Sequence, residues 1–287
     1  MSTSTPRPEF VLPEGDWPAT LPLAHRAQLR GLLNELRRDP DLVGVAAGGS
    51  FISGRMDEFS DLDLVVAVRS DAWPAVLERR REIAARAGSL LAAFTGEHVG
   101  EPRLLICLYG PPLVHVDLKF VTLDTLAMRV EDPVVLWDRL GALPRAMADG
   151  KATYPTPDLQ WIEDRFWVWV HYAATKLGRG ETLELLDFLS FLRGRVLGPL
   201  ALQAAGAQPN GVRRLEELAP GFAAGLRTTV AEPHRKDGLR ALQQAVALYQ
   251  KLREESGLPL GRRAAAEAEA IEYVRQLEAR VSRDGET

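Results

Sequence analysis

Two aspartates separated by one residue, Asp61 and Asp63, stand at the start of the apolar run 62–68. Side chains alternate along a strand, so both carboxylates are expected on the same face. Neighbouring carboxylates repel each other unless a cation lies between them. Mg²⁺ suits such a pair because it takes few protein carboxylates and completes its shell with water and substrate phosphates. The pair therefore indicates a Mg²⁺ site that serves a phosphate-bearing substrate, and a solvated strand end is the alternative.

A glycine-rich turn, Gly48-Gly49-Ser50, directly follows the apolar run 43–47. Glycine has no Cβ, so the backbone can approach a ligand closely, and successive N–H groups with a serine hydroxyl can hold phosphate oxygens. Gly49 and Ser50 are therefore candidate nucleotide-binding residues. The same three residues also form ordinary turns, so the motif gains weight only together with the aspartates.

A third acid, Asp117, lies in the run 113–122, where polar and apolar residues alternate. The apolar face is expected in the core. The other face carries Asp117 between two potential cations, His115 and Lys119. An edge strand with a solvated polar face is the alternative for this segment.

Apolar periodicity predicts the elements that must position these residues. Two helices are expected at 21–38 and 73–94, with proline in the first turn of the second. Strands are expected at 43–47, 62–68, 103–109, 113–122 and 134–137, the third and fourth joined as a hairpin.

Beyond residue 158 the apolar residues show helical periodicity only, at 161–177, 183–204, 239–255 and 264–281. The sequence therefore predicts a flexible tail over 1–18, a catalytic α+β domain over 19–150 and an all-α helical bundle over 151–287. The α+β domain should contain a small mixed sheet with flanking helices.

Composition narrows the function classes. Thirty-five basic and 39 acidic residues give a net charge of -4, whereas proteins that bind nucleic acid usually carry a basic face. A nucleic-acid partner is therefore not expected.

The single cysteine, Cys107, lies in an apolar run and is predicted to be a buried small hydrophobe. No stretch resembles a signal peptide or reaches the roughly 20 apolar residues of a membrane span. We expect a cytoplasmic protein without membrane contact; the oligomeric state stays open.

The order strand, Gly-Ser turn, Asp-x-Asp strand, helix and later strand with a third Asp resembles the polymerase-beta-like nucleotidyltransferase superfamily, over roughly residues 40–140. Within it, the chain looks most like the antibiotic (aminoglycoside) nucleotidyltransferases, which also join a compact catalytic domain to a helical one. The segments 57–63 and 173–181 share that likeness. The residues that match the superfamily motif are Gly49, Ser50, Asp61, Asp63 and Asp117.

The resemblance implies a two-metal mechanism in which Asp61 and Asp63 hold Mg²⁺ against the phosphates of an NTP, with ATP expected. An acceptor hydroxyl attacks the α-phosphorus and pyrophosphate leaves. Gly49 and Ser50 would hold the terminal phosphates. Asp117 would be the third metal ligand or the general base.

Some relatives take the base from a glutamate outside the triad, and Glu97 and Glu163 are the candidates here. By the same resemblance, Lys176 and Arg179 could reach the triphosphate. Cations at a helix C-terminus also complement the helix dipole, which is the structural alternative for both. Lys119 could contact phosphate or pair with Asp117.

The resemblance also implies the acceptor, a hydroxyl-rich, cationic small molecule of the aminoglycoside kind held between the two halves. Acidic residues near the start of the helical half would attract amines, and aromatic neighbours could stack on sugar rings. The candidate substrate contacts are Glu97, Trp161, Glu163 and Asp164. Two other functions stay open: a nucleotidyltransferase of the toxin–antitoxin type that modifies a protein or RNA end, and an inactive nucleotide-binding module.

Overall fold

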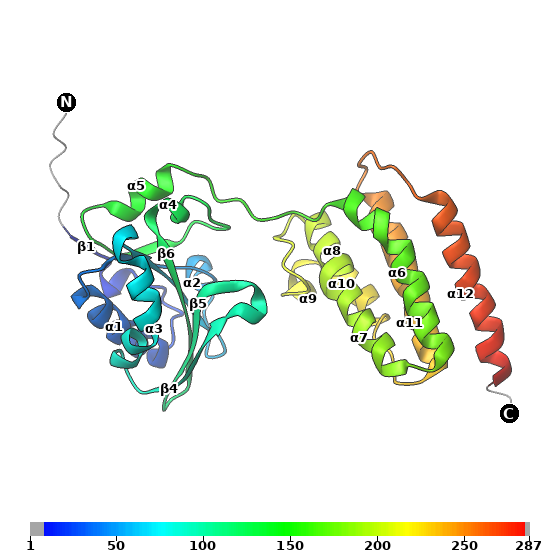
Figure 1. Ribbon diagram of the computed structural model, residues 1–287, viewed down its shortest axis with the longest axis horizontal. Coiled ribbons are helices and arrows are strands. Elements are labelled where there is room, and N and C mark those ends of the chain that lie inside the picture. The colour runs from blue at the N-terminus through cyan, green and yellow to red at the C-terminus, as the bar shows by residue number, and fades with distance from the viewer. Residues whose placement is uncertain (1–8, 285–287) are drawn as a thin grey trace. The chain divides into compact units, whose positions relative to one another are not determined.

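The computed structural model describes residues 9–284 (Figure 1). Contacts divide the chain into two compact units, with the boundary between Thr153 and Tyr154. The first, called here the sheet unit, contains every strand of the described residues, and the second, called the helical unit, contains only helices. No helix in the described part of the chain combines the length and apolar character that a membrane span requires.

The sheet unit is built on a seven-stranded mixed sheet with the strand order β1-β7-β2-β3-β6-β5-β4. Only the pair β3 and β6 is parallel, and every other neighbouring pair is antiparallel. The strands are β1 (Phe10–Val11), β2 (Leu42–Ala47), β3 (Leu62–Val68), β4 (Leu90–Gly96), β5 (Glu101–Tyr109), β6 (Val114–Thr122) and β7 (Val134–Asp138). The α+β class and the hairpin of β5 and β6 expected from the sequence are confirmed.

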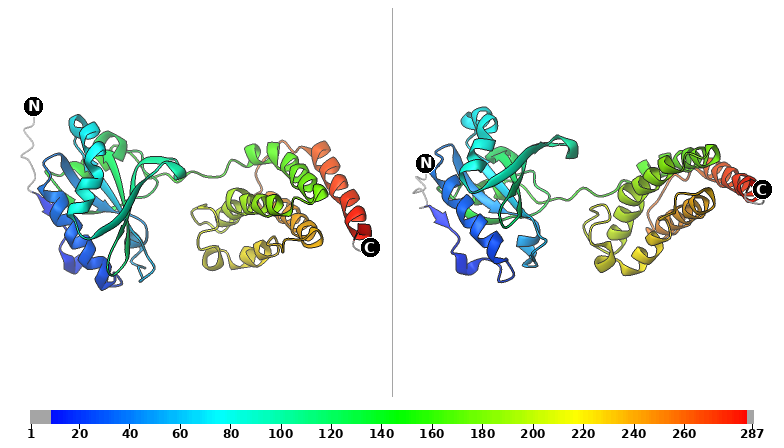
Figure 2. Two further views of the ribbon diagram at one scale, coloured as in Figure 1. Left: turned by 60° about the horizontal axis from the view of Figure 1, so that its bottom comes forward. Right: turned by 90° about the horizontal axis from the view of Figure 1, so that it is seen from below.

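Helices cover both faces of this sheet, but not equally. The long amphipathic helices α1 (Leu23–Arg38) and α3 (Trp73–Arg86) pack on one face, where they share a core with the inward side chains of β2, β3, β5 and β6 (Figure 2). The short helices α4 (Leu123–Leu126) and α5 (Ala142–Ala148) contribute to a second, smaller core with residues of β2, β3 and β6.

Part of the segment expected as a flexible tail belongs to the folded unit. Residues 1–8 lie outside the described range, but β1 pairs with β7, and a 3-10 turn, η1 (Glu14–Asp16), follows it. The indole of Trp17 is 5% exposed, and the Trp137 indole N–H donates to the Glu9 carboxylate at 2.6 Å. These contacts anchor residues 9–18 to the edge of the sheet.

The helix predicted over 73–94 is too long, because α3 ends at Arg86 and β4 begins at Leu90. Gly88 has a φ of 155° and separates the two elements. Alanines and leucines in 90–93 kept the helical spacing of the sequence pattern. Pairing of this segment with β5, including Phe94 opposite Ile106, overrides that local preference.

The helical unit contains three long helices, α6 (Leu159–Arg179), α11 (Arg235–Glu255) and α12 (Ala264–Asp284). The helix expected over 183–204 is α7 (Thr182–Leu192), a π-helical turn η4 (Arg193–Leu197) and α8 (Gly198–Ala204) in succession. Two short helices were not predicted, α9 (Leu215–Leu218) and α10 (Pro220–Arg227).

Candidate active site

Three aspartates meet where β3 and β6 run side by side. The parallel register places Asp63 directly opposite Asp117, and Asp61 stands just before β3. Each residue offers one carboxylate oxygen, and these oxygens all lie within 4.8 Å of one another. All three residues are half-buried. The fold therefore brings together carboxylates from positions up to 56 residues apart (117 minus 61).

The electrostatics of this cluster favour a bound cation. Burial raises the pKa of Asp117, and the nearby charge of Asp61 raises it further. His115, whose Nε2 lies 3.0 Å from Oδ1 of Asp117, acts in the opposite direction and lowers that pKa. Crowded carboxylates in a partly dehydrated place are costly without a cation. A donor set made only of carboxylate oxygens fits a hard divalent cation such as Mg²⁺.

The glycine turn lies directly against this cluster. Gly49 has a φ of 56°, and a Cβ built there would lie 2.0 Å from Oδ2 of Asp63. The Gly48 N–H donates to the Asp63 carbonyl at 2.8 Å. Glycine is therefore required at position 49, because any side chain would displace the Asp63 carboxylate.

Ser50 begins the short helix α2 (Ser50–Ser53), and its Oγ is buried without a hydrogen-bond partner among the described residues. A buried hydroxyl without a partner is costly, and such groups often have a role in binding. A phosphate oxygen would satisfy it. Ser50 thus has the chemistry expected of a phosphate ligand.

Sequence reasoning missed Glu131, which lies between α4 and β7. Its Oε1 accepts the Gly49 N–H at 2.8 Å. The amide that could hold a phosphate oxygen therefore already binds an anionic oxygen of the chain itself. No local motif marks Glu131, because its partner is 82 residues away.

Two other candidates of the sheet unit have their contacts with residues outside the cluster. Lys119 Nζ contacts Glu101 Oε2 at 2.8 Å and not Asp117. Arg103, and then Lys119, hold the pKa of Glu101 at about 2. Glu97 begins the turn η3 (Glu97–Val99) after the edge strand β4, and its carboxylate accepts a hydrogen bond from Thr95. Glu97 is not a member of the carboxylate cluster.

The two roles considered for Glu163, substrate contact and alternative base, are wrong. Its side chain is 0% exposed and lies inside the helical unit. The carboxylate accepts the Tyr249 hydroxyl at 2.6 Å, the Arg263 amide at 2.9 Å and the Arg253 guanidinium at 3.2 Å. Arg253 also binds Glu267 at 2.9 Å. Glu163 is therefore a structural anion that joins α6, α11 and α12.

The two other candidate substrate contacts in α6 lie at the surface. Trp161 is 47% exposed, and the Arg165 guanidinium lies 4.1 Å from its ring centroid. The Asp164 carboxylate contacts Arg263 at 2.7 Å and Gln160 at 2.8 Å. Trp161 keeps an accessible ring, whereas Asp164 is already paired with a cation.

The two basic candidates of the helical unit differ in their neighbours. Lys176 Nζ lies 3.0 Å from Glu181 and 2.8 Å from Glu184, and these two acids raise its pKa. Arg179, the last residue of α6, is largely exposed, and its nearest acid is Glu181 at 3.9 Å. A phosphate would have to compete with two carboxylates for Lys176, but with only one distant carboxylate for Arg179.

Comparison with known proteins gives structural neighbours only. No protein-family model and no curated protein matches the chain. Among solved structures, an aminoglycoside 6-adenyltransferase from Bacillus subtilis is similar, with 15% identity, coverage of 88% of this chain and 98% of the other, and a TM-score of 0.41. A nucleotidyltransferase-like protein from Exiguobacterium sibiricum has 12% identity, coverage of 85% and 77%, and a TM-score of 0.35.

Proposed function

We propose that the chain is a Mg²⁺-dependent nucleotidyltransferase that moves a nucleoside monophosphate, AMP from ATP, onto a hydroxyl of a small molecule. The observation that carries the proposal is the cluster of Asp61, Asp63 and Asp117, whose oxygens lie within 4.8 Å of one another beside a glycine turn. This grouping matches the sequence motif residue by residue. A bound cation would also offset the repulsion among the three carboxylates.

In the proposed reaction the acceptor oxygen forms a bond to the α-phosphorus, and the bond to the bridging oxygen of the β-phosphate breaks, which releases pyrophosphate. Asp61 and Asp63 would hold Mg²⁺, which supplies neutralisation of the phosphate charge when bound. Ser50 Oγ and the Gly49 N–H bind phosphate oxygens and orient the triphosphate. Asp117 either completes the metal site or takes the proton of the acceptor hydroxyl, a role suited to a carboxyl whose pKa burial raises.

Glu131 adds a condition to this mechanism. The Gly49 N–H can bind a phosphate oxygen only after Glu131 releases it. The carboxylate and the triphosphate are both anions, so they also repel each other across the same amide. Nucleotide binding is therefore coupled to movement of Glu131 away from the turn.

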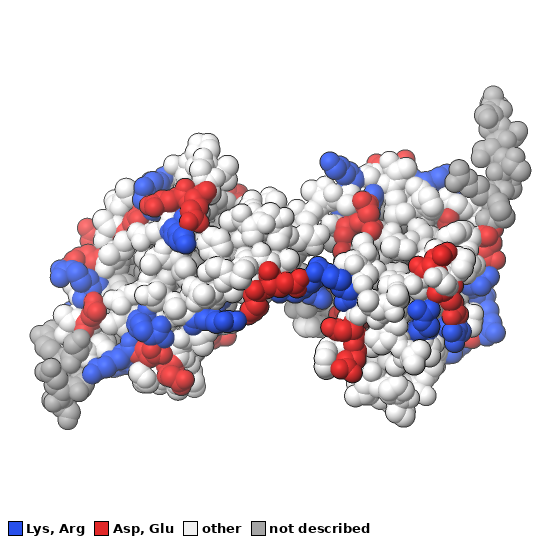
Figure 3. Space-filling model, turned by 180° about the vertical axis from the view of Figure 1, so that it is seen from behind, with Lys and Arg blue, Asp and Glu red and all other residues white. Residues whose placement is uncertain are grey.

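The acceptor we propose is a hydroxyl-rich, cationic small molecule of the aminoglycoside kind. Its support is the resemblance of the sequence, together with exposed Trp161. Glu163 no longer supports it, because that carboxylate is buried. Figure 3 shows Lys and Arg side chains interspersed with Asp and Glu over the drawn face of each unit, rather than gathered into one basic surface. Such a distribution does not favour a nucleic-acid acceptor.

The nucleotide half of the proposal is tested by the shift in melting temperature that Mg²⁺ and a non-hydrolysable ATP analogue produce. Ligand at 100 times its Kd stabilises a protein by about 2.7 kcal/mol. Asp63→Ala should abolish the shift, while its melting temperature without ligand stays unchanged or rises as repulsion is relieved. Asp71→Ala is the matched control, because this exposed acid stands beyond the other end of β3. An undiminished shift in Asp63→Ala would overturn the proposal.

The acceptor half is tested by calorimetry with streptomycin, kanamycin and spectinomycin in the presence of Mg²⁺ and the same analogue. Binding that weakens as salt is added is expected for a cationic acceptor. If none of the three compounds produces heat and AMP is instead transferred to protein or tRNA, the proposed acceptor class is wrong. The proposed reaction would then still stand.

A further inference from the structure

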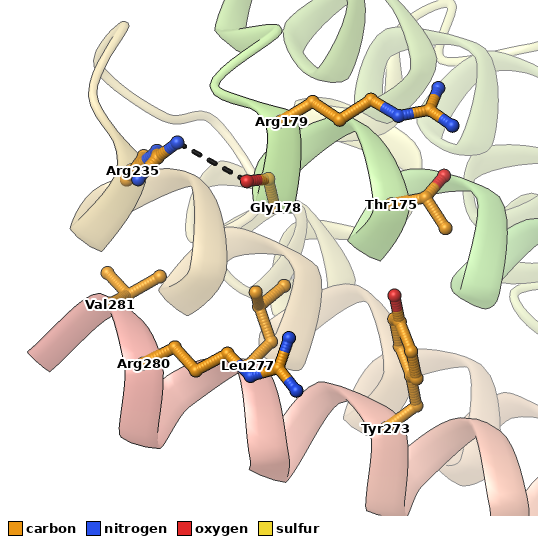
Figure 4. A pocket seen from close by; sticks show the side chains of 8 residues that line it. All are labelled: Thr175, Gly178, Arg179, Arg235, Tyr273, Leu277, Arg280 and Val281. Atoms are coloured by element: carbon orange, nitrogen blue, oxygen red, sulfur yellow. Dashed lines mark hydrogen bonds between the residues drawn. The ribbon is translucent and has the colours of Figure 1, made fainter.

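Polar side chains outside the proposed mechanism occur in both units. In the helical unit, Thr175 of α6 and Tyr273 of α12 line a cavity of about 260 Å³, and Figure 4 shows them on facing helices. In the sheet unit, His25 of α1 is 3% exposed, and its ring contacts the loop that leads into β3. The contact of His25 reaches a residue next to the carboxylate cluster, so it is the one that bears on the reaction.

The imidazole of His25 holds the main chain immediately before Asp61. Its Nε2 lies 2.7 Å from the carbonyl oxygen of Ser60, a residue 35 positions further along the chain. A carbonyl oxygen can only accept a hydrogen bond, so Nε2 carries the proton and donates it. Ser60 precedes Asp61 directly. The contact therefore ties the backbone beside a carboxylate of the cluster to the first turn of α1.

The loop 57–60 has a fixed shape of its own. The Asp57 carboxylate accepts the Phe59 amide and the Ser60 hydroxyl, both at 3.0 Å, and the Ser60 amide donates to the Asp57 carbonyl at 3.1 Å. These bonds all lie within the loop. Among the contacts that Ser60 makes with the described residues, only the bond from His25 reaches beyond the loop. That bond therefore sets where Ser60 lies relative to the rest of the sheet unit.

His25 occupies its place at a cost in stability. Its Nδ1 is buried and has no hydrogen-bond partner among the described residues. A buried polar atom without a partner destabilises a fold, and an apolar side chain would avoid this cost. The buried neighbours of His25 along α1 are all leucines: Leu29, Leu32, Leu33 and Leu36. Packing of this helix face thus requires only an apolar residue, and the proton donated to Ser60 is the feature that histidine adds.

We propose that His25 is a positioning residue, which fixes the Asp61 carboxylate for metal binding by holding the Ser60 carbonyl. It acts through the backbone of Ser60, as a hydrogen-bonded support behind a metal ligand. The inference rests on the proposed function, because it requires that Asp61 binds Mg²⁺. Loss of such a supporting hydrogen bond typically lowers metal affinity or activity about 10–100-fold.

The test compares two substitutions in the full chain. His25→Leu removes the donor, whereas His25→Gln keeps an N–H group at a similar reach. His25→Leu should lower the affinity for Mg²⁺ with the non-hydrolysable ATP analogue by about 10–100-fold. Its melting temperature without ligand should stay within a few degrees of the unaltered chain, because removal of the unpaired Nδ1 offsets the lost hydrogen bond. His25→Gln should recover most of the affinity.

Gln28→Leu is the matched control. Gln28 lies about one turn further along α1, and its Nε2 also donates to a backbone carbonyl, that of Ala87 at 3.3 Å. Ala87 follows α3 and does not lead into the carboxylate cluster. Gln28→Leu should therefore keep the affinity of the unaltered chain. Amide hydrogen exchange without metal gives a second measurement: exchange over 57–61 should be faster in His25→Leu and unchanged in Gln28→Leu.

Four outcomes would overturn the inference. These are unchanged affinity in His25→Leu, an equal loss in Gln28→Leu, no recovery in His25→Gln, and a melting temperature of His25→Leu that is many degrees lower, which would make His25 a purely structural residue. The unaltered chain separates this inference from the proposed function. Absence of Mg²⁺ and nucleotide binding there would overturn the proposed function, whereas binding that His25→Leu leaves unchanged would overturn this inference alone.

Discussion

Replacement of Gly49 by alanine tests the link between the glycine turn and the carboxylate cluster. The added Cβ would lie 2.0 Å from Oδ2 of Asp63, whereas real Cβ atoms essentially never approach another heavy atom within 3.0 Å. The carboxylate oxygen must therefore retreat by about 1 Å. A displacement of that size at a catalytic group can lower a rate about 100-fold. We expect Gly49→Ala to lower Mg²⁺-dependent pyrophosphate release, and the affinity for Mg²⁺ with an ATP analogue, by about this factor.

Gly54→Ala separates this effect from backbone strain. Gly54 ends α2 with a φ of 63°, so alanine there is also strained, but a Cβ would meet no atom within 4 Å. Alanine in a left-handed conformation costs about 1–2 kcal/mol. Gly54→Ala should therefore melt a few degrees lower than the unaltered chain. Gly49→Ala should melt lower still, because Gly49 has a φ of 56° and a ψ of -134°, a conformation outside the left-handed helical region that is harder for alanine to adopt.

Only Gly49→Ala should lose the stabilisation by Mg²⁺ and nucleotide. The link between the glycine turn and the carboxylate cluster would be refuted if Gly49→Ala kept the affinity of the unaltered chain, because Asp63 would then tolerate displacement. It would be refuted equally if Gly54→Ala lost as much affinity, because strain alone would then account for the result.

Four further substitutions probe separate parts of the chain. Glu131→Ala should bind the ATP analogue more tightly, since the Gly49 amide is then free of its internal acceptor; weaker binding in a thermal-shift titration would contradict this. Asp117→Asn should slow turnover by roughly 10²–10⁴-fold, with analogue affinity preserved if Asp117 is the base and lowered if it is a metal ligand. Glu163→Ala should lower the free energy of unfolding in urea by about 3–5 kcal/mol, because a buried arginine loses a partner; a loss below about 1 kcal/mol would show that Glu267 alone suffices. Arg79 lowers the pKa of Asp39 in the folded state. The ionised carboxylate therefore stabilises the fold fully at pH values above its unfolded pKa of about 3.9. This stabilisation is lost as pH falls through the lower pKa of the folded state. Asp39→Asn should therefore flatten the decline of urea stability below about pH 4.

The pair Asp61 and Asp63 could be predicted from strand periodicity, whereas Asp117 could be assigned to the same cluster only through the resemblance to a known superfamily. Alternation placed Asp61 and Asp63 on one face, and the same alternation identified the polar face of the strand with Asp117. The parallel pairing of β3 and β6 could not be derived in this way. It depends on the crossover through α3 and the inserted hairpin strands, and hence on contacts between segments far apart in the chain.

Burial of Cys107 was predicted correctly for a related reason. The residue lies on the inward face of β5 at 1% exposure, and burial raises the pKa of its thiol to about 12. Strand β4 was missed because its residues also fit a helix. An edge strand takes its conformation from the neighbour it pairs with, here β5, and that neighbour is invisible to a local pattern.

The helical periodicity of the sequence indicated that Glu163 is buried, but the residue types around it favoured a different interpretation. Its acidic neighbours and nearby tryptophans favoured a place in a binding cleft. Helical spacing, however, puts position 163 on the same face as Leu159, Phe166 and Val170, all of which are buried. An acid on an apolar stripe requires a cation on the stripe of a neighbouring helix, because an unpaired buried charge is prohibitively costly. Arg253 occupies such a position, next to buried Leu252 on α11. The two residues contact each other at 3.2 Å. A charged residue of each sign, interrupting the apolar stripes of two helices, is therefore a pattern that predicts a buried ion pair from the amino-acid sequence.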